Sequence, residues 1–253
     1  MMKISFNGAL VEIADAPCNE SGWLLGTGIF ETIKTVNGAP YALALHLQRA
    51  GMSAKILGFN LPSIPSIELA VRELLIAEPN ENGHLRVSFN VNGQWSAIHL
   101  PYQPLTGSAK IRIHPDPLMS RGARIKSYPY DQRLAILNEA KLLGFDEAIV
   151  FNAEGNISEG AVSNIMAQIN GQWITPPISD GALPGIMRGL VIENCRVAIA
   201  TIPISHIGDI TSAFLLSSLR IAQPISSIEG RHLQVSQAFK EEIHAKAVAG
   251  SLG

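Results

Sequence analysis

Four Asn-Gly pairs constrain the fold of this 253-residue chain more than any other feature. Each pair separates two runs of β-forming residues, and together they lie at Asn7-Gly8, Asn37-Gly38, Asn92-Gly93 and Asn170-Gly171. Asn-Gly is the favoured pair for a tight hairpin, because both residues tolerate a positive φ. The sequence therefore predicts a chain rich in antiparallel strands.

Helical periodicity occurs in five segments that lie between or after these strand runs. Apolar residues recur at helical spacing near 47–57, 67–76, 131–143, 185–195 and 235–243. Strands and helices that are segregated in this way indicate the α+β class.

The segment 114–122 predicts a domain boundary. Its sequence, HPDPLMSRG, holds two prolines and a glycine within nine residues, and such a run interrupts any regular element. We therefore predict a small N-terminal domain over 1–113, a linker over 114–122 and a larger C-terminal domain over 123–253. The alternative is a long loop within one domain.

Composition excludes several classes of protein. The chain is 47% hydrophobic and 16% charged, which is typical of a soluble globular protein. A net charge of -2 without a Lys/Arg cluster argues against nucleic acid as a partner, because neutralising phosphates requires a basic face. The N-terminus lacks the features of a signal peptide, and no segment approaches the ~18 apolar residues that span a bilayer. We expect a cytoplasmic protein without membrane contact, and without a metal site, because the seven histidines show no metal-ligand spacing.

Lys126 precedes a predicted helix and two predicted strands, and Glu159 lies in the second strand. The predicted helix over 131–143 ends at Gly144, a strand follows from Glu147 to Phe151, and a second strand returns from Asn156 to Ile169. This path can bring the lysine and the glutamate together. Such a pair suits pyridoxal phosphate (PLP), which needs an amine for its Schiff base and an acid beside its ring nitrogen. For an arbitrary pair, two solvated surface charges are the commoner arrangement, so the surrounding sequence has to decide.

Five further motifs carry a resemblance to a known family. They are GTGIFETIKT at 26–35, LHLQRAGMSAKILG at 45–58, DEAIVFNAEGNISEGAVSNI at 146–165, TPPISDGALPGIMR at 175–188 and LLSSLRIAQPISSIEG at 215–230. These motifs resemble the fold-type IV PLP enzymes, which include branched-chain aminotransferases, D-amino-acid aminotransferases and 4-amino-4-deoxychorismate lyases. The resemblance implies two domains, a barrel-like core in the larger one, PLP at their interface and a homodimer.

The resemblance also implies roles for three residues around the cofactor ring. Lys126 matches the lysine that forms the Schiff base, because it lies about twenty residues before the Asp-Glu-Ala motif at 146–148. Glu159 matches the glutamate that pairs with the ring nitrogen. Tyr130 is a candidate for the tyrosine that hydrogen-bonds the phenolate oxygen, although Pro129 intervenes and the spacing is one residue short. A place for Tyr130 in the core is the alternative.

The phosphate group requires a cation and backbone amides. Arg49 matches the family arginine, and a guanidinium suits a phosphate dianion; a lone helix arginine would otherwise be solvated. The turn at 183–185 resembles the family turn into a helix whose first amides, at Ile186 and Met187, bind phosphate. Ser218 matches a hydroxyl residue that completes the phosphate site.

The departures from the family pattern concern the substrate. The turn after Ser218 is built from small residues in the aminotransferases, whereas here it contains Leu219 and Arg220. Arg220 is therefore a candidate ligand for a substrate carboxylate, and the alternative is that it points to solvent. Arg86 aligns with an arginine near the pocket in some relatives, and Phe30 matches a strand that lines the pocket or belongs to the core.

Two reactions remain open. An aminotransferase, our prediction, moves an amino group between an amino acid and a 2-oxo acid, whereas 4-amino-4-deoxychorismate lyase, the alternative, expels pyruvate and leaves 4-aminobenzoate. Both begin with removal of the Cα proton, so the catalytic residues do not choose between them. The complete set of Lys126, Glu159 and Arg49 disfavours a protein that binds PLP without turnover. A nucleotide-binding module is disfavoured because no strand is followed by Gly-x-Gly-x-x-Gly.

Overall fold

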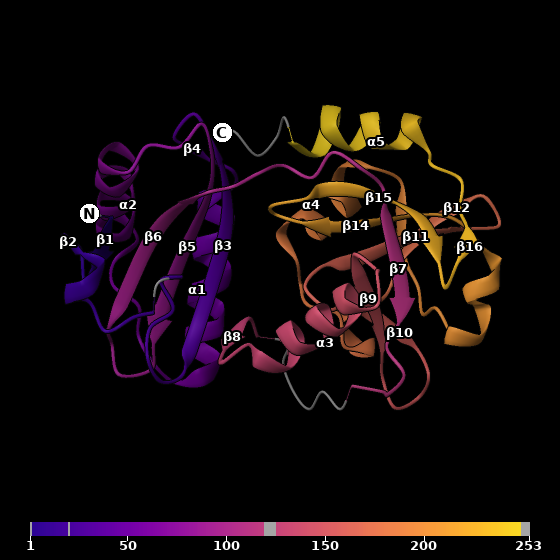
Figure 1. The fold of residues 1–253 in the computed structure, drawn as a ribbon, viewed down its shortest axis with the longest axis horizontal. Helices are drawn as coiled ribbons and strands as arrows, with labels where there is room; N and C mark the ends of the chain where they lie inside the picture. Colours follow the sequence, from indigo (N-terminus) through magenta and orange to yellow (C-terminus); the bar gives the residue numbers. More distant parts are fainter. Residues whose placement is uncertain (1, 20, 119–124, 249–253) are drawn as a thin grey trace. The chain divides into compact units, whose positions relative to one another are not determined.

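The structure of this chain is a computed structural model that describes residues 2–19, 21–118 and 125–248. The chain divides into two compact units (Figure 1). Unit 1 comprises the described residues of Met1–Pro104 together with Ile125–Pro129. Unit 2 comprises those of Leu105–Arg124 and Tyr130–Ser251.

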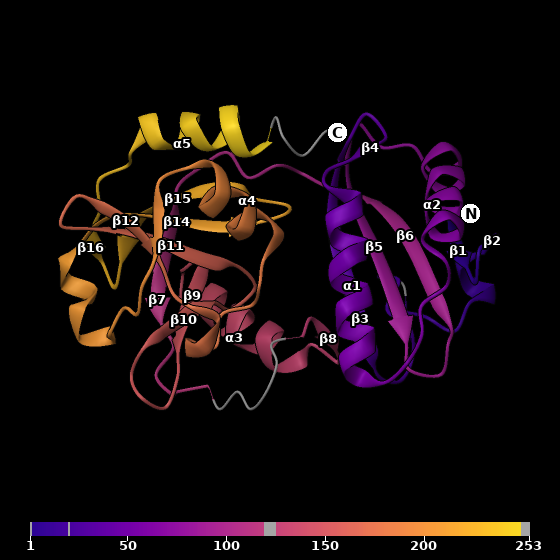
Figure 2. The same ribbon diagram turned by 180° about the vertical axis from the view of Figure 1, so that it is seen from behind.

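Unit 1 is a sheet with two helices packed on one face. Among the described residues the strand order is β2-β1-β6-β5-β3-β4, and β8 also pairs with β3. Figure 2 shows α1 in front of β3 and β5. The elements are β1 (Lys3–Phe6), β2 (Ala9–Glu12), β3 (Gly28–Val36), β4 (Ala39–Pro40), α1 (Leu43–Leu57), α2 (Ile64–Ala77), β5 (Asn82–Asn90), β6 (Trp95–Pro101) and β8 (Ser127–Tyr128).

The alternation of side chains along β3 separates two environments in unit 1. Ile29 and Ile33 belong to the core with the apolar faces of α1 and α2, and Glu31 contacts α1 on the same side. Phe30 points to the opposite face, because successive side chains of a strand alternate. The side chains of Ile29 and Ile33 therefore lie on the core face of this sheet, and the side chain of Phe30 lies on the opposite face.

The hairpin prediction is confirmed at three Asn-Gly pairs. At Asn7, Asn37 and Asn170 the asparagine φ is 50° to 51°, and the following glycine also has a positive φ. This geometry matches the right-handed twist of the paired strands. At Asn92-Gly93 only the glycine has a positive φ, because the loop between β5 and β6 is longer.

Unit 2 contains a curled mixed sheet with helices around it. Its described strands have the order β10-β9-β7-β15-β14-β11-β12-β13, and β16 pairs with β15. The pairs β7–β9, β7–β15 and β12–β13 are parallel. The elements are β7 (Ala109–Ile113), α3 (Asp131–Leu142), β9 (Glu147–Phe151), β10 (Ile157–Gly160), β11 (Asn164–Ile169), β12 (Gln172–Thr175), α4 (Ile186–Asn194), β13 (Val197–Ile199), β14 (Ile210–Ser217), β15 (Ile221–Ile228), β16 (Arg231–His232) and α5 (Gln237–Ile243).

Two main apolar clusters stabilise unit 2. One is formed by the aliphatic side chains of β7, β9, β11, β14 and β15. The other places α4 and α5 against the sheet, and there Trp173 stacks on Phe239 with ring centroids 4.1 Å apart. The five predicted helices and the α+β class are confirmed.

The single returning strand predicted over 156–169 is instead two strands. β10 pairs with β9, whereas β11 pairs with β14 and β12, and a bend at 161–163 separates them. The buried Glu147 carboxylate stabilises this bend, because its Oε1 accepts hydrogen bonds from Val162 N at 2.9 Å and Ser163 Oγ at 2.8 Å. A Cβ at Gly160 would lie 2.5 Å from the same oxygen, so a larger residue there would disturb these hydrogen bonds.

The residues around the predicted linker are only partly described. β7 belongs to unit 2, because it pairs with β9 and β15. Residues 119–122 of the predicted linker lie outside the described residues, and the predicted domain boundaries stay a prediction. In the described part of the chain, no helix is long and apolar enough to cross a membrane.

Candidate active site

Lys126 lies at the start of a short strand that extends the sheet of unit 1. β8 pairs with the beginning of β3, where Ile29 faces Ser127, and Phe30 N donates a hydrogen bond to Lys126 O at 2.9 Å. The Lys126 Nζ lies 4.6 Å from the centroid of the Phe30 ring. The sheet thus fixes the backbone of the predicted Schiff-base lysine and places its amine over an aromatic ring.

Aromatic and cationic side chains surround Phe30. The Trp23 ring meets Phe30 edge-on with centroids 4.5 Å apart, and the Arg86 guanidinium lies 4.0 Å from the Trp23 ring. Arg86 Nη1 donates to Ser21 O at 2.6 Å, whereas its buried Nε makes no hydrogen bond to the described residues. Burial lowers the pKa of Arg86 to about 10, so the side chain is still a cation at neutral pH. Phe30, Arg86 and Lys126 therefore share one side of the unit 1 sheet.

Arg49 lies on the other side of the same sheet, between α1 and β3. Its Nε donates to Glu31 Oε1 at 2.8 Å and its Nη2 to Glu31 Oε2 at 2.5 Å, and His46 Nδ1 lies 2.6 Å from Oε2. Burial raises the pKa of Glu31, but Arg49 and His46 outweigh this effect and lower the pKa to about 2. The predicted phosphate ligand is thus a buried side chain held in one orientation by a carboxylate.

Glu159 is buried in unit 2, where Arg133, Asn164 and Leu183 donate hydrogen bonds to its carboxylate. Oε1 accepts from Arg133 Nη2 at 2.8 Å, and Oε2 accepts from Asn164 Nδ2 at 3.1 Å and from Leu183 N at 2.9 Å. Asn164 Nδ2 also donates to Leu183 O at 2.9 Å. Glu159, Asn164 and the turn before α4 therefore form one hydrogen-bonded frame.

The turn into α4 fits closely around Asn164. A Cβ at Gly185 would lie 1.9 Å from Asn164 Oδ1, so a larger N-cap residue of α4 would push the Asn164 side chain out of its hydrogen bonds. Ile186 and Met187 are the first two residues of this helix, and their amides belong to its positive end. Arg188 follows: its Nη2 donates to Pro176 O at 2.8 Å, and its buried Nε makes no hydrogen bond to the described residues.

The hairpin between β14 and β15 carries the remaining predicted residues. Ser218, Leu219 and Arg220 form its half-buried turn, and Ile221 has a φ of 60°, which is rare for a β-branched residue. The Arg220 guanidinium is not directed to solvent. Its Nη2 pairs with the Oε2 of Glu147, which is fully buried, and its Nη1 donates to Gln223 Oε1 at 2.6 Å. The solvent alternative for Arg220 is therefore wrong.

Tyr130 is half-buried and occupies the position that precedes α3. Leu134 N donates to its carbonyl at 3.1 Å, so the residue closes the first turn of the helix. Its predicted contact with the cofactor stays a prediction.

Several residues of the site escaped the sequence analysis. Arg133, Asn164 and Glu147 act through partners that are distant in sequence, and periodicity does not reveal such pairs. Asn164 lies inside the quoted motif at 146–165, and Trp23 lies three residues before the motif at 26–35. An arginine in the first turn of a helix, where the helix dipole disfavours a cation, was the available signal for Arg133.

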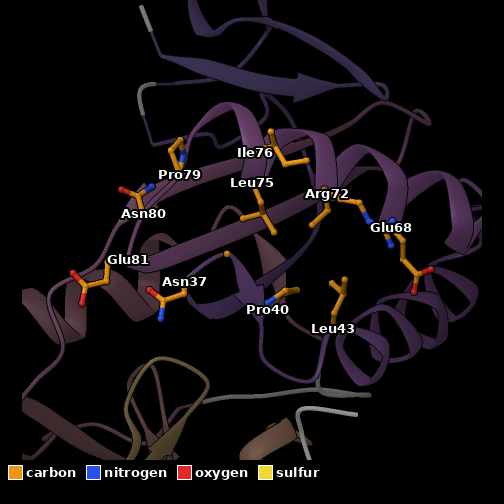
Figure 3. Close-up of a pocket in the computed structure, with 12 residues that line it drawn as sticks. Asn37, Pro40, Leu43, Glu68, Arg72, Leu75, Ile76, Pro79, Asn80 and Glu81 are labelled. Carbon is orange, nitrogen blue, oxygen red and sulfur yellow. The ribbon is translucent and has the colours of Figure 1, made fainter.

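A cavity of about 760 Å³ lies elsewhere in unit 1. Figure 3 shows Arg72 and Leu75 of α2 along one side and Asn37 and Pro40 along the other. Asn37 follows the end of β3, whereas β8 pairs with its beginning, about eight residues or ~26 Å away along the strand. This cavity is therefore not the site that contains Lys126.

Comparison with known proteins decides the family. The model of the family described as amino-transferase class IV matches residues 28–228. The chain belongs to the class IV aminotransferases. The family prediction is confirmed, and the protein is an enzyme.

Individual relatives of this class IV enzyme have two kinds of name. A putative branched-chain-amino-acid aminotransferase of Methanocaldococcus jannaschii is 26% identical over 262 residues, which cover 93% of this chain and 91% of the relative. An aminodeoxychorismate lyase of Bacillus subtilis is 27% identical over 218 residues, which cover 76% of this chain and 73% of the relative. Both predicted reactions therefore occur among the relatives.

Solved structures agree with the fold. A branched-chain aminotransferase from Thermoproteus uzoniensis, determined with norvaline, has a TM-score of 0.86 at 25% identity and covers 99% of this chain and 95% of its own. A hypothetical aminotransferase from Mycobacterium tuberculosis in a PLP-bound form has a TM-score of 0.83 at 18% identity, covers 98% of this chain and 99% of its own, and shows the fold alone.

The family implies PLP, and the residues of unit 2 fit that cofactor. A buried acid is available for a ring nitrogen. The first amides of α4, at Ile186 and Met187, are at the positive end of a helix, which suits an anion. The buried Nε of Arg188 adds positive charge beside this turn.

Proposed function

We propose that this enzyme is a PLP-dependent aminotransferase that moves an amino group between an amino acid and a 2-oxo acid. The observation that supports the proposal most is the bonding of Glu159. Its carboxylate is buried and bound by a guanidinium, an amide side chain and a backbone amide. An acid held in this way suits a protonated ring nitrogen, because its negative charge is already oriented and desolvated.

The predicted cofactor residues divide the cofactor between them in this proposal. Lys126 would hold PLP through its amine, Glu159 would pair with the ring nitrogen and Tyr130 would donate to the phenolate oxygen. The phosphate is bound by the Arg49 guanidinium, the amides of Ile186 and Met187, and the Ser218 hydroxyl. The role of Arg49 has less support, because its Nε and Nη2 bind Glu31 and it lies on the face of the unit 1 sheet opposite Phe30.

When bound, PLP supplies the electron sink for cleavage of a bond at the substrate Cα. Lys126 accepts the Cα proton and returns it at C4′ of the cofactor, as a general base and then a general acid. Glu159 holds the proton of the ring nitrogen by offering it a negative acceptor.

The substrate-binding roles have unequal support. Arg86 and Phe30 lie on the same side of the unit 1 sheet as Lys126, and the guanidinium of Arg86 suits a substrate carboxylate. Leu219 would contribute a backbone amide from the β14–β15 turn. The predicted role of Arg220 has less support, because its guanidinium binds Glu147 and Gln223.

The second candidate is 4-amino-4-deoxychorismate lyase, which the relative from Bacillus subtilis favours. It would use the same Lys126 and Glu159, because both reactions begin with proton removal at Cα. The difference arises in the substrate pocket, where the Leu219 and Arg220 turn departs from the aminotransferase pattern.

A spectroscopic experiment tests the proposal. An aminotransferase that receives an L- or D-amino acid should lose the visible band of its bound cofactor and release a 2-oxo acid. A strict lyase should keep that band with amino acids and should release 4-aminobenzoate and pyruvate from 4-amino-4-deoxychorismate. If the protein binds PLP but does neither, the proposed function is wrong.

Substitution of the lysine provides the matched control. Lys126→Ala should abolish the visible band and all turnover, whereas Lys141→Ala should retain both, because Lys141 is exposed on α3. Turnover by Lys126→Ala at the native rate would refute the assignment. We also propose a homodimer, to be measured by light scattering, and a cytoplasmic location, to be measured by cell fractionation.

A further inference from the structure

Arg133 occupies an unfavourable place for a cation. It is the third residue of α3, and its side chain is only 12% exposed. The N-terminus of a helix is its positive end, where a basic side chain is destabilising. Removal from water adds a further cost. A compensating partner is therefore required.

Glu159 is that partner. Arg133 Nη2 lies 2.8 Å from Glu159 Oε1, and Nη1 donates to Gly160 O at 3.3 Å. The Glu159 side chain is 8% exposed, so both charges are largely desolvated. In such surroundings a charge-assisted hydrogen bond is shorter and stronger than a neutral one, and it fixes the orientation of the carboxylate.

Two further donors to Glu159, Asn164 and Leu183, are neutral. Asn164 Nδ2 and Leu183 N both bind Oε2, whereas Arg133 binds Oε1. Of these three donors, Arg133 alone carries charge and alone restrains Oε1. A second guanidinium is near: burial lowers the pKa of Arg188, and the negative charge of Glu159 opposes that shift. Arg133 and Arg188 thus both place positive charge near this buried carboxylate.

We propose that Arg133 is a positioning residue that holds the Glu159 carboxylate in the orientation in which it pairs with the ring nitrogen of PLP. This inference rests on the proposed function, in which Glu159 pairs with that nitrogen. A rotated carboxylate would offer the protonated nitrogen a weaker acceptor. Arg133 acts through Glu159 and does not itself touch the cofactor.

The test compares two ligands that differ only at the ring nitrogen. They are PLP and its deaza analogue, in which a CH group replaces that nitrogen. Binding of each to the apoprotein is titrated by visible absorbance and intrinsic fluorescence. The wild-type protein should prefer PLP, because only PLP can bond to Glu159.

In Arg133→Met the Glu159 carboxylate loses the charged hydrogen bond that orients it, and the affinity for PLP should fall about ten-fold. The affinity for the deaza analogue should change less than about two-fold, since this analogue has no ring nitrogen that could bond to Glu159. Arg133→Lys keeps the charge and should recover part of the preference; it also replaces Arg133→Met if that variant does not fold. Arg112→Met is the matched control, because Arg112 pairs with the half-exposed Glu139 elsewhere in unit 2.

Three outcomes would overturn the inference. If both ligands lose affinity equally, Arg133 only supports the fold. If neither changes, the ion pair does not act on the cofactor. If the preference for PLP rises, Arg133 competes with the ring nitrogen. A wild-type protein that binds both ligands equally would instead refute the role of Glu159, and a wild-type protein that binds neither would refute the proposed function itself.

Discussion

Replacing Arg220 by methionine removes the guanidinium that neutralises the buried Glu147 carboxylate. Glu147 has no exposed surface, and its Oε2 pairs with Arg220. In Arg220→Met the carboxylate either remains charged without a cation or binds a proton, and both cost free energy. We therefore expect unit 2 to be destabilised.

The magnitude follows from the remaining contacts of Glu147. Breaking one partner of a buried ion pair costs about 3–5 kcal/mol. Val162 N and Ser163 Oγ still bind Oε1, so we expect the lower end, about 3 kcal/mol. For a protein of this size, that loss corresponds to a decrease in Tm of roughly 6–12 °C.

A double-mutant cycle isolates the pair. Glu147→Gln keeps an oxygen for Val162 N and Ser163 Oγ but removes the charge. The double variant Glu147→Gln/Arg220→Met should therefore be more stable than Arg220→Met alone, with a coupling energy of about 2 kcal/mol. Urea unfolding and calorimetry of the apoprotein measure all four members of the cycle.

Arg112→Met is the matched surface control. It breaks the pair with Glu139, whose side chain is 48% exposed, and should cost less than about 1 kcal/mol. If Arg220→Met is no more destabilising than this control, the pair with Glu147 does not stabilise the fold. The same result would leave the Arg220 guanidinium available for the predicted contact with a substrate carboxylate.

Three further predictions concern other residues. Glu31 has a folded pKa of about 2 against a usual value of 4.5, so its ion pair contributes about 3 kcal/mol of stability, which is fully present above pH 4.5 and is lost as the pH falls toward 2. Urea unfolding between pH 6 and pH 3 should therefore show a weaker dependence of stability on pH in Glu31→Gln than in the wild-type protein. The same dependence in both proteins would contradict this prediction. Burial, together with positive neighbours, lowers the pKa of His84 to about 3 from 6.5, so stability should decline as the pH falls from 6.5 toward 3, and less so in His84→Gln. Gly185→Ala places a Cβ against Asn164 and should reduce the stability by about 1–3 kcal/mol, measured by thermal unfolding. The control Gly189→Ala, where no atom lies near the new Cβ in α4, should raise the stability by about 0.5–1 kcal/mol. Equal changes in stability in the two variants would exclude the clash with Asn164.

Local patterns predicted the elements of this fold well. Asn-Gly chemistry identified hairpins at Asn7, Asn37 and Asn170, and the apolar period identified the helices, because both signals reside in a few adjacent residues. The division of the 156–169 strand was missed because a side chain outside the segment, Glu147, imposes the bend. Long-range contacts of this kind are absent from any local pattern.

The same distinction applies to the candidate site. Lys126, Glu159 and Arg49 were predicted from motifs, whereas their immediate partners, Phe30 apart, were not. Glu31 was quoted within a motif without a role, and Arg133 was not considered at all. An ion pair between two elements depends on how those elements pack. The sequence motifs therefore indicated the charged groups but did not predict the contacts that orient them.

The hydrogen bonds that join Glu159, Asn164 and Leu183 have a consequence for how this enzyme can change its specificity. Asn164 bonds both the acid and the opening of α4, so an alteration at either end disturbs the contacts of the other. We propose that new substrates are accommodated elsewhere, by the Phe30 and Arg86 side of unit 1 or by the turn that contains Leu219. Directed evolution should accumulate its productive replacements in those two places and leave Glu159 and Asn164 unaltered.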